Sequence, residues 1–270
     1  DLANPFFSMI LEGISRHLSQ QGYSMLIAST KQVQDSGEKL VDYLDDTRAD
    51  GMIILDGGLD AEVVKSLEGA PQSNRVLFAC EWIEGTSFPS VRCENRKGTR
   101  AAVNYLYDLG HRKIAHITGP EGNVLMLRRR DAFVAEMVKL KLELKPEWVI
   151  AGDFSLAAGC KSAKRWIALE DRPTAVFCAS DQLAMGFIAE LSRHGFSVPE
   201  DVSVMGFDDI DLAEQFIPPL TTIRQNRIMI GETAAKMLMA RIISPAIEHE
   251  VHNAVLPVSL VSRESTAALL

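Results

Sequence analysis

Thiol and imidazole side chains are the groups in this sequence best suited to metal binding or nucleophilic catalysis, and their spacing indicates neither chemistry. The four cysteines lie far apart, with no Cys-x-x-Cys pair of the kind that zinc sites use: they are Cys80, Cys93, Cys160 and Cys178. Each lies in or beside an apolar stretch, where a buried thiol acts as a small apolar group. The six histidines are scattered, so the sequence assembles no nucleophile, base and orienting acid.

The motifs of common enzyme and nucleotide sites are also missing. The sequence has no Gly-x-x-x-x-Gly-Lys-Ser/Thr phosphate loop and no Gly-x-Gly-x-x-Gly. It has no Gly-x-Ser-x-Gly nucleophile motif and no His-Glu-x-x-His zinc pair. His111 and His116 flank the start of a strand-like run, where a histidine is usually a hydrogen-bonded structural residue. We therefore predict a protein that is not an enzyme and for which no cofactor or metal is indicated.

Length and charge limit the possible partners. The chain has 270 residues, of which 47% are hydrophobic and 24% charged, as in soluble globular proteins. This length favours two compact lobes over one. The 28 basic residues against 36 acidic ones give a formal charge of −8, which argues against these residues holding a nucleic-acid duplex by themselves. No apolar run is long enough for a membrane helix, and no export signal is visible at Asp1.

Short apolar runs alternate with amphipathic segments along the chain. Six runs are typical of strands covered on both faces, as in parallel sheets: residues 52–55, 76–80, 114–118, 149–151, 175–179 and 202–205. Between them, apolar residues recur every three or four positions, for example from Phe6 to Leu18, which predicts amphipathic helices. The repeated alternation of strand and helix predicts βαβ units and an α/β fold.

Capping residues agree with these helices. Asn4-Pro5 has the form of an N-cap followed by proline at the first helical position. Three glycines each follow a helical stretch, where a left-handed residue ends a helix: Gly22, Gly110 and Gly195. Ser180 or Asp181 can cap the helix that follows the fifth strand. The first helix begins so close to Asp1 that we expect the strand before it to have been removed or not counted.

Six phrases of the sequence, taken together, resemble the lactose-repressor (LacI/GalR) family of bacterial transcriptional regulators. They occur in the family's order and span almost the whole chain: NPFF at 4–7, DLGHRKIA at 108–115, ASDQLAMG at 179–186, VPEDVSVMGFDD at 198–209, PPLTTIRQ at 218–225 and LVSREST at 260–266. Any one phrase is a weak signal, whereas six in this order are not expected by chance.

The resemblance implies the effector-binding domain of such a regulator, without its helix-turn-helix headpiece. The family fold is two similar lobes, each with a mostly parallel sheet flanked by helices, of the type I periplasmic-binding-protein kind and joined by three crossings. On this basis we expect an N-terminal lobe at 1–93 and 227–254 and a C-terminal lobe at 94–226 and 255–270. The family also implies a cytoplasmic homodimer, contact with operator DNA through the absent headpiece, and no contact with a membrane.

The family binds its ligand between the lobes, at the carboxyl ends of the strands. The resemblance carries nine contact residues over to this sequence: Phe6, Phe7, Glu81, Trp82, Arg129, Phe154, Ser180, Asp208 and Gln225. Arg129 offers a planar fork of donors for vicinal hydroxyls or a carboxylate. Phe154 offers a ring that can stack on a sugar face or a purine. Asp208 ends an apolar strand and offers only acceptors, for a ligand hydroxyl or amine or for Arg129.

Several of these residues have an alternative role. For Phe6 and Phe7 it is packing in the core, and for Trp82 it is covering the interface between the lobes. Arg128 and Arg130 leave the register of Arg129 open, and either can be an ordinary solvated charge. For the aspartates the alternative is helix or turn capping, which fits Asp181 and Asp209 better than their neighbours. Ser180 and Asp208 are therefore the preferred ligand contacts.

Two functions from different classes remain open on the sequence alone. The first is control of transcription, in which a sugar, a sugar derivative or a purine-like effector binds the regulator and changes its affinity for DNA. The alternative is an extracytoplasmic solute-binding protein of a sugar transporter, which shares the fold. The phrases at 198–209 and 218–225 are those of regulators and favour the first function. The sequence does not say whether the effector releases or promotes DNA binding.

Overall fold

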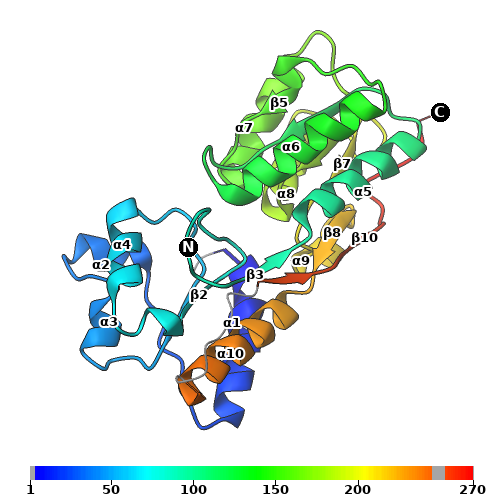
Figure 1. Ribbon diagram of the computed structural model, residues 1–270. Helices are drawn as coiled ribbons and strands as arrows, with labels where there is room; N and C mark the ends of the chain where they lie inside the picture. Colours follow the sequence, from blue (N-terminus) through cyan, green and yellow to red (C-terminus); the bar gives the residue numbers. More distant parts are fainter. Residues whose placement is uncertain (1–3, 245–252, 270) are drawn as a thin grey trace. The chain divides into compact units, whose positions relative to one another are not determined.

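A computed structural model describes residues 4–244 and 253–269 (Figure 1). The chain forms two compact units: unit 1 comprises residues 1–93 and 226–256, and unit 2 comprises residues 94–225 and 257–270. The chain therefore passes from one unit to the other three times, after Cys93, Gln225 and Leu256. The boundaries expected from the sequence differ from these by one residue at 226 and by two residues at 255–256.

Unit 1 is built on a parallel sheet of four strands. Their order across the sheet is β1 (Met52–Ile54), β2 (Val76–Ala79), β3 (Ser90–Cys93) and β9 (Ala254–Leu256). β2 is buried along its whole length, as expected for an apolar run in the middle of a parallel sheet. Unit 1 is completed by β9, a strand that follows all of residues 94–225 in the sequence.

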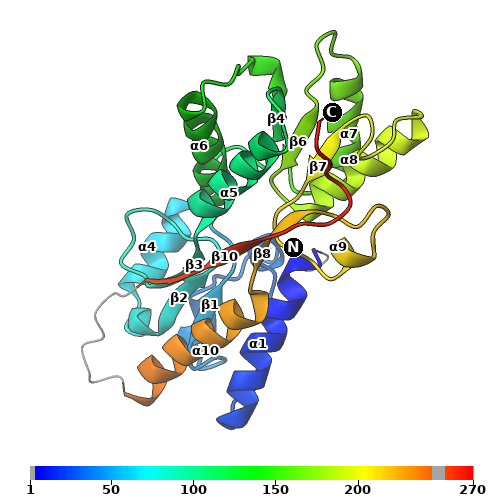
Figure 2. The same ribbon diagram turned by 90° about the vertical axis from the view of Figure 1, so that its right-hand side faces the viewer.

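Two long helices, α1 (Phe6–Gln20) and α10 (Arg227–Ile243), lie against each other in unit 1 (Figure 2). They meet at glycines. A Cβ on Gly13 would lie 2.3 Å from a backbone oxygen of α10, and a Cβ on Gly231 would lie 2.1 Å from a backbone oxygen of α1. Both positions therefore require glycine. The shorter helices of unit 1 are α2 (Thr30–Asp35), α3 (Asp42–Asp45), α4 (Ala61–Gly69) and the 3-10 helix η1 (Ser73–Arg75).

The start of α1 has the predicted cap. Oδ1 of Asn4 accepts a hydrogen bond from the backbone N–H of Phe6 at 2.9 Å. Pro5 between them has helical dihedral angles, with φ −62° and ψ −15°. The prediction of an N-cap followed by proline is confirmed.

Unit 2 contains a second parallel sheet of four strands. Their order is β5 (Val149–Ile150), β4 (Ile114–Ile117), β6 (Ala175–Cys178) and β7 (Ser203–Met205). Strands β8 (Thr222–Gln225) and β10 (Val258–Val261) form a separate antiparallel pair, in which Gln225 lies opposite Val258. Each unit is therefore an α/β structure with a parallel sheet, as the alternating pattern of the sequence predicts.

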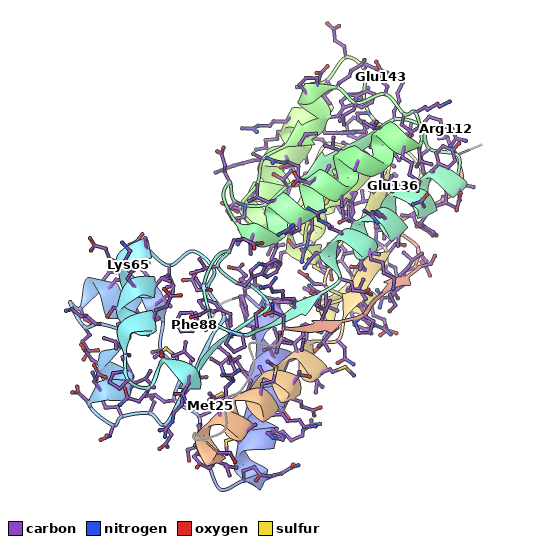
Figure 3. The ribbon with its side chains drawn as sticks, viewed as in Figure 1. Met25, Lys65, Phe88, Arg112, Glu136 and Glu143 are labelled. Carbon is purple, nitrogen blue, oxygen red and sulfur yellow. The ribbon has the colours of Figure 1, made fainter. Side chains whose placement is uncertain are left out.

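Two pairs of helices flank the sheet of unit 2, and Figure 2 shows one pair on each side of it. In the pair formed by α5 and α6, Glu136 (Figure 3) accepts a hydrogen bond from Asn104 at 2.9 Å. In the pair formed by α7 and α8, a Cβ on Gly186 would lie 2.1 Å from a backbone oxygen of α7. The helices of unit 2 are α5 (Asn95–Asp108), α6 (Val124–Lys139), α7 (Leu156–Ile167), α8 (Asp181–Arg193), α9 (Leu212–Gln215) and the 3-10 helix η2 (Pro146–Trp148).

The local signals of the sequence agree with these elements. All six apolar runs contain strands, and the three glycines expected at helix ends have positive φ, between 78° and 96°. Four strands were not predicted from apolar runs in the sequence, because half-buried or exposed positions interrupt their apolar character: β3, β8, β9 and β10. Cys80, Cys93 and Cys178 are buried, and Cys160 is half-buried. Within the described ranges, no helix has the length and apolarity needed to cross a bilayer.

Candidate functional site

The carboxyl ends of the parallel strands of unit 2 form one edge of its sheet. Three of the expected ligand contacts follow these strands: Phe154 after β5, Ser180 after β6 and Asp208 after β7. Because parallel strands end at the same edge, these residues lie on the side where α/β sheets bind small molecules. This edge is the candidate site of unit 2.

Phe154 brings an aromatic ring to the end of β4. Its φ is +66°, a left-handed conformation that is uncommon outside glycine. The ring is so close to Gly119 that a Cβ there would lie 2.6 Å from a ring carbon and 2.8 Å from the sulfur of Met126. The same sulfur accepts a hydrogen bond from the Gly119 N–H at 3.0 Å. The half-buried ring is therefore fixed at the strand edge beside a thioether.

Arg129 of α6 is 1% exposed and lies beside Asp208. Its Nε donates to Oδ1 of Asn95 at 2.8 Å, and its Nη1 donates to the carbonyl oxygen of Ala179. Nη1 also lies 3.8 Å from Oδ1 of Asp208, and the guanidinium carbon lies 3.8 Å from the ring centroid of Phe207. The guanidinium is thus held in place next to the carboxylate that is expected to bind ligand.

Asp208 has a further partner in β8, at the point where the chain leaves unit 2. Nε2 of Gln225 donates to Oδ1 of Asp208 at 2.8 Å, and both side chains are largely buried. The backbone N–H of Gln225 donates to the carbonyl oxygen of Asp208 at 3.3 Å. The structure therefore brings three of the predicted residues, Arg129, Asp208 and Gln225, together around one carboxylate.

The backbone at Asp208 and Asp209 is left-handed, with φ values of +123° and +56°. Such conformations cost about 1–3 kcal/mol each and persist only where the surroundings impose them. Asp209 is held by ion pairs: Arg224 Nε donates to its Oδ2, and Arg263 Nη2 donates to its Oδ1 at 2.8 Å. The Asp209 carboxylate is thus bound by two guanidinium groups, and its role as a turn cap stays a prediction.

Ser180, and not Asp181, caps α8. Its Oγ accepts a hydrogen bond at 3.3 Å from the backbone N–H of Leu183, so of the two caps that the sequence allows the structure has Ser180. Asp181 is completely buried, and its carboxylate accepts hydrogen bonds from the Ile210 N–H and the Thr222 hydroxyl. Burial, and then the repulsion of Asp208, raises the pKa of Asp181 well above its usual value. A capping Ser180 still has a hydroxyl hydrogen to donate, so its contact with a ligand stays a prediction.

Glu81 and Trp82 follow β2 at the carboxyl edge of the sheet of unit 1. Oε2 of Glu81 accepts a hydrogen bond from the Gly57 N–H at 2.8 Å, which ties it to the segment after β1. The indole N–H of Trp82 donates to Oε1 of Glu84 at 2.9 Å. The guanidinium carbon of Arg92 lies 4.1 Å from the centroid of the Trp82 ring. Both predicted residues thus have partners within unit 1, and their contact with a ligand stays a prediction.

Phe6 and Phe7 begin α1, with their rings edge to face and the ring centroids 5.3 Å apart. Phe6 is 7% exposed, and Phe7 is half-buried. Phe6 is packed in the core and Phe7 keeps more of its surface accessible, and contact of either ring with a ligand stays a prediction.

His111 and His116 are internal to unit 2. Nδ1 of His111 is hydrogen-bonded to the Thr174 hydroxyl at 2.9 Å. The His116 ring is stacked between Phe133 and Phe177, with both ring centroids 4.9 Å away. These are structural contacts, as predicted. In the part of the chain that the structure describes, no group of three or more His, Cys, Asp and Glu side chains could hold a metal ion.

Sequence reasoning missed Asn95, which holds Arg129 although it is 34 positions away. A lone buried amide gives no sequence signal for such a contact. It also missed the backbone strain at the strand edges. Three non-glycine residues that follow parallel strands have positive φ: Cys80, Phe154 and Asp208. Strain of this kind concentrates at functional sites, so it supports the choice of these edges.

Comparisons with known proteins agree with this fold. A family model for the periplasmic binding protein-like domain matches residues 103–266. The HTH-type transcriptional repressor CytR of Escherichia coli (strain K12) is 35% identical over 239 residues, which are 88% of this chain and 70% of CytR. A LacI family transcriptional regulator from Enterococcus faecium with bound ribose is 28% identical, with a TM-score of 0.88 over 100% of this chain and 97% of that one. The complex of the transcriptional regulator CelR with cellobiose is 29% identical, with a TM-score of 0.86 over 98% of this chain and 80% of that one.

The parallel sheets and their strand-end residues thus define a periplasmic-binding-protein-like domain. The chain belongs to the LacI/GalR family of transcriptional regulators, as its sequence phrases predict. The relatives named above are regulators of transcription, not enzymes, and they favour the regulator over the transporter component.

Proposed function

We propose that this chain is the effector-binding part of a DNA-binding repressor and that its effector is a sugar or a sugar derivative. The observation that carries the proposal is the group formed by Arg129, Asp208 and Gln225 at the strand edge of unit 2. Two relatives with a similar fold hold sugars, ribose in one case and cellobiose in the other. A purine-like effector is the second candidate, because the Phe154 ring can stack on a flat base as well as on a sugar face.

The distances in this group suit a ligand rich in hydroxyls. Nη1 of Arg129 and Oδ1 of Asp208 are 3.8 Å apart, which is longer than a direct charge-assisted hydrogen bond of about 2.7–2.9 Å. A hydroxyl can donate to Asp208 and accept from Arg129 at the same time, so it can bridge the two groups. Phe154 lies at the same sheet edge and offers an apolar surface to the C–H face of the ligand.

The effector then controls transcription through its different affinities for two states of the regulator. A coupling of about 1–3 kcal/mol changes operator affinity by about 5- to 150-fold. Contact of the four predicted residues of unit 1 (Phe6, Phe7, Glu81 and Trp82) with a ligand stays a prediction. The protein acts in the cytoplasm as a homodimer and binds operator DNA through a helix-turn-helix headpiece.

Isothermal titration calorimetry with ribose, cellobiose and a purine nucleoside tests the proposal. We expect the wild-type chain to bind one of these probes. Asp208→Ala removes charged hydrogen bonds and should weaken that binding by about 10- to 100-fold. Glu214→Ala, at an exposed acidic residue of α9, is the matched control and should leave the affinity unchanged. Equal affinities of wild type and Asp208→Ala would rule out the assignment of this carboxylate.

A further inference from the structure

The left-handed turn at Asp208 and Asp209 is held in place by two ion pairs of the Asp209 carboxylate. The Asp209 carboxylate accepts one hydrogen bond from Arg224 and one from Arg263. The side chains of Asp209 and Arg263 are 8% and 12% exposed, whereas that of Arg224 is 53% exposed. The pair with Arg263 is therefore shielded from solvent, where an ion pair is screened less than at the surface. Asp209 is held firmly although it is not one of the expected ligand contacts.

Both arginines belong to segments that join unit 2 to the rest of the chain. Arg224 lies in β8, one residue before Gln225, where the chain leaves unit 2. Arg263 follows β10, which begins one residue after the chain re-enters unit 2 at Pro257. Asp209 thus connects the exit segment and the re-entry segment of unit 2 through one carboxylate.

The orientation of Asp208 depends on the same turn. Its backbone N–H donates to the carbonyl oxygen of Ile223 at 2.8 Å, and its carbonyl oxygen accepts from the Gln225 N–H. These bonds fix Asp208 to β8 at a φ of +123°, a value that an aspartate does not favour. If Asp209 were released, the turn could relax, and the Asp208 carboxylate would move away from Gln225 and Arg129.

Arg129, the other partner of Asp208, links it to the third connecting segment. Nε of Arg129 donates to Asn95, which lies two residues after Cys93, where the chain first enters unit 2. Asp208 contacts Arg129 and Gln225, and its neighbour Asp209 contacts Arg263, so the two aspartates together link residues of all three connecting segments.

We propose that Asp209 is a positioning residue: clamped by Arg224 and Arg263, it holds Asp208 in its ligand-binding conformation and couples the occupancy of Asp208 to the connecting strands. This inference rests on the proposed role of Asp208 in binding the effector. It extends that role in two ways. Asp209 keeps the turn in its strained conformation, and the connecting strands β8 and β10 respond to the bound ligand.

Hydrogen exchange tests the inference without any ligand. Asparagine tolerates a left-handed φ, so Asp209→Asn removes the charge and leaves the backbone preference satisfied. We expect the amides of residues 208 and 225 to exchange about tenfold faster or more, while the amide of Phe177 in the central strand β6 changes little. Glu214→Gln, on exposed α9, is the control and should change none of them. Equal acceleration at all three amides, or none at 208 and 225, would overturn the inference.

Calorimetry with ribose and cellobiose gives a second readout that separates the inference from the proposed function. For a probe that the wild type binds, Asp209→Asn should weaken binding by about 5- to 30-fold, although Asp209 touches no ligand in the proposal. Unchanged affinity would overturn the positioning role. If the wild type binds neither sugar, the choice of effector fails, and the exchange rates at 208 and 225 still decide the role of Asp209.

Discussion

Nη1 of Arg129 lies 3.8 Å from Oδ1 of Asp208, in a pair whose side chains are only 2% and 11% exposed. The guanidinium is oriented by two hydrogen bonds that use its planar fork, one to Asn95 and one to the carbonyl oxygen of Ala179. The position of the charge beside Asp208 therefore depends on the shape of arginine as well as on its charge.

Arg129→Lys should lower the free energy of unfolding by about 2–4 kcal/mol. A single ammonium group on a flexible stem cannot reach Asn95, Ala179 and Asp208 together, so buried polar groups lose their partners. Urea unfolding followed by circular dichroism measures the change. Arg130→Lys is the neighbouring control, because the Arg130 side chain is 46% exposed, and it should change stability by less than about 0.5 kcal/mol. Equal small effects at both positions would contradict this prediction.

His116 should make the stability of the chain depend on pH. Burial lowers the pKa of His116 from 6.5 to about 4, because the folded core favours the neutral ring. The unfolded chain therefore takes up the proton first, and the free energy of unfolding should fall as the pH drops from about 6.5 to about 4, by about 3 kcal/mol in total. Urea titrations at several pH values measure this loss.

His116→Gln removes the titrating ring and should flatten the pH dependence in that window. His17→Gln, at a half-buried position of α1, is the control and should keep the wild-type curve. The explanation fails if His116→Gln loses as much stability between pH 6.5 and 4 as the wild type does.

Gly186→Ala should destabilise unit 2 through the contact between α7 and α8. The new Cβ would lie 2.1 Å from the carbonyl oxygen of Leu156, a backbone atom that cannot rotate away. Forcing the helices apart should cost about 1–3 kcal/mol, measured by thermal or urea unfolding. Gly69→Ala, where a Cβ meets no atom within 4 Å, is the matched control and should be neutral or slightly stabilising. Comparable losses of stability in Gly186→Ala and Gly69→Ala would contradict this prediction.

Ser180→Ala should cost about 1 kcal/mol, because it removes the N-cap hydrogen bond of α8. Ser192→Ala, at an exposed position of the same helix, should have little effect on the unfolding midpoint. The same two variants also test the predicted ligand contact. If Ser180 donates to the effector, Ser180→Ala should weaken sugar binding in calorimetry, whereas Ser192→Ala should not.

Much of the fold could be predicted because the central strands are buried on both faces and read as unbroken apolar runs. The strands that escaped prediction carry exposed side chains, such as Arg224 in β8, or lie at a sheet edge like β9. Their pairing is set by partners far away in the sequence, for example Gln225 with Val258. No local pattern encodes such a register.

The candidate site was predicted only in part, for a related reason. Asp208 and Phe154 could be placed at strand ends, because their positions follow from the order of strands and from the family phrases. The partners that hold Asp209 are separated from it by 15 and 54 positions, at Arg224 and Arg263. The sequence also does not predict a positive φ at an aspartate, because glycine is the residue that indicates such a turn.

The contact between α1 and α10 has a consequence for the order in which the molecule can form on the ribosome. The apolar face of α1, which includes Ile10 and Ile14, is covered by a helix that is translated more than 200 positions later. At about 5–20 residues per second, that helix emerges roughly 10–40 s after its partner. By then all four strands of the unit 2 sheet have left the exit tunnel, so that sheet can form before the apolar face of α1 is covered. During this interval the apolar side chains of α1 on the nascent chain lack the helix that covers them in the folded unit.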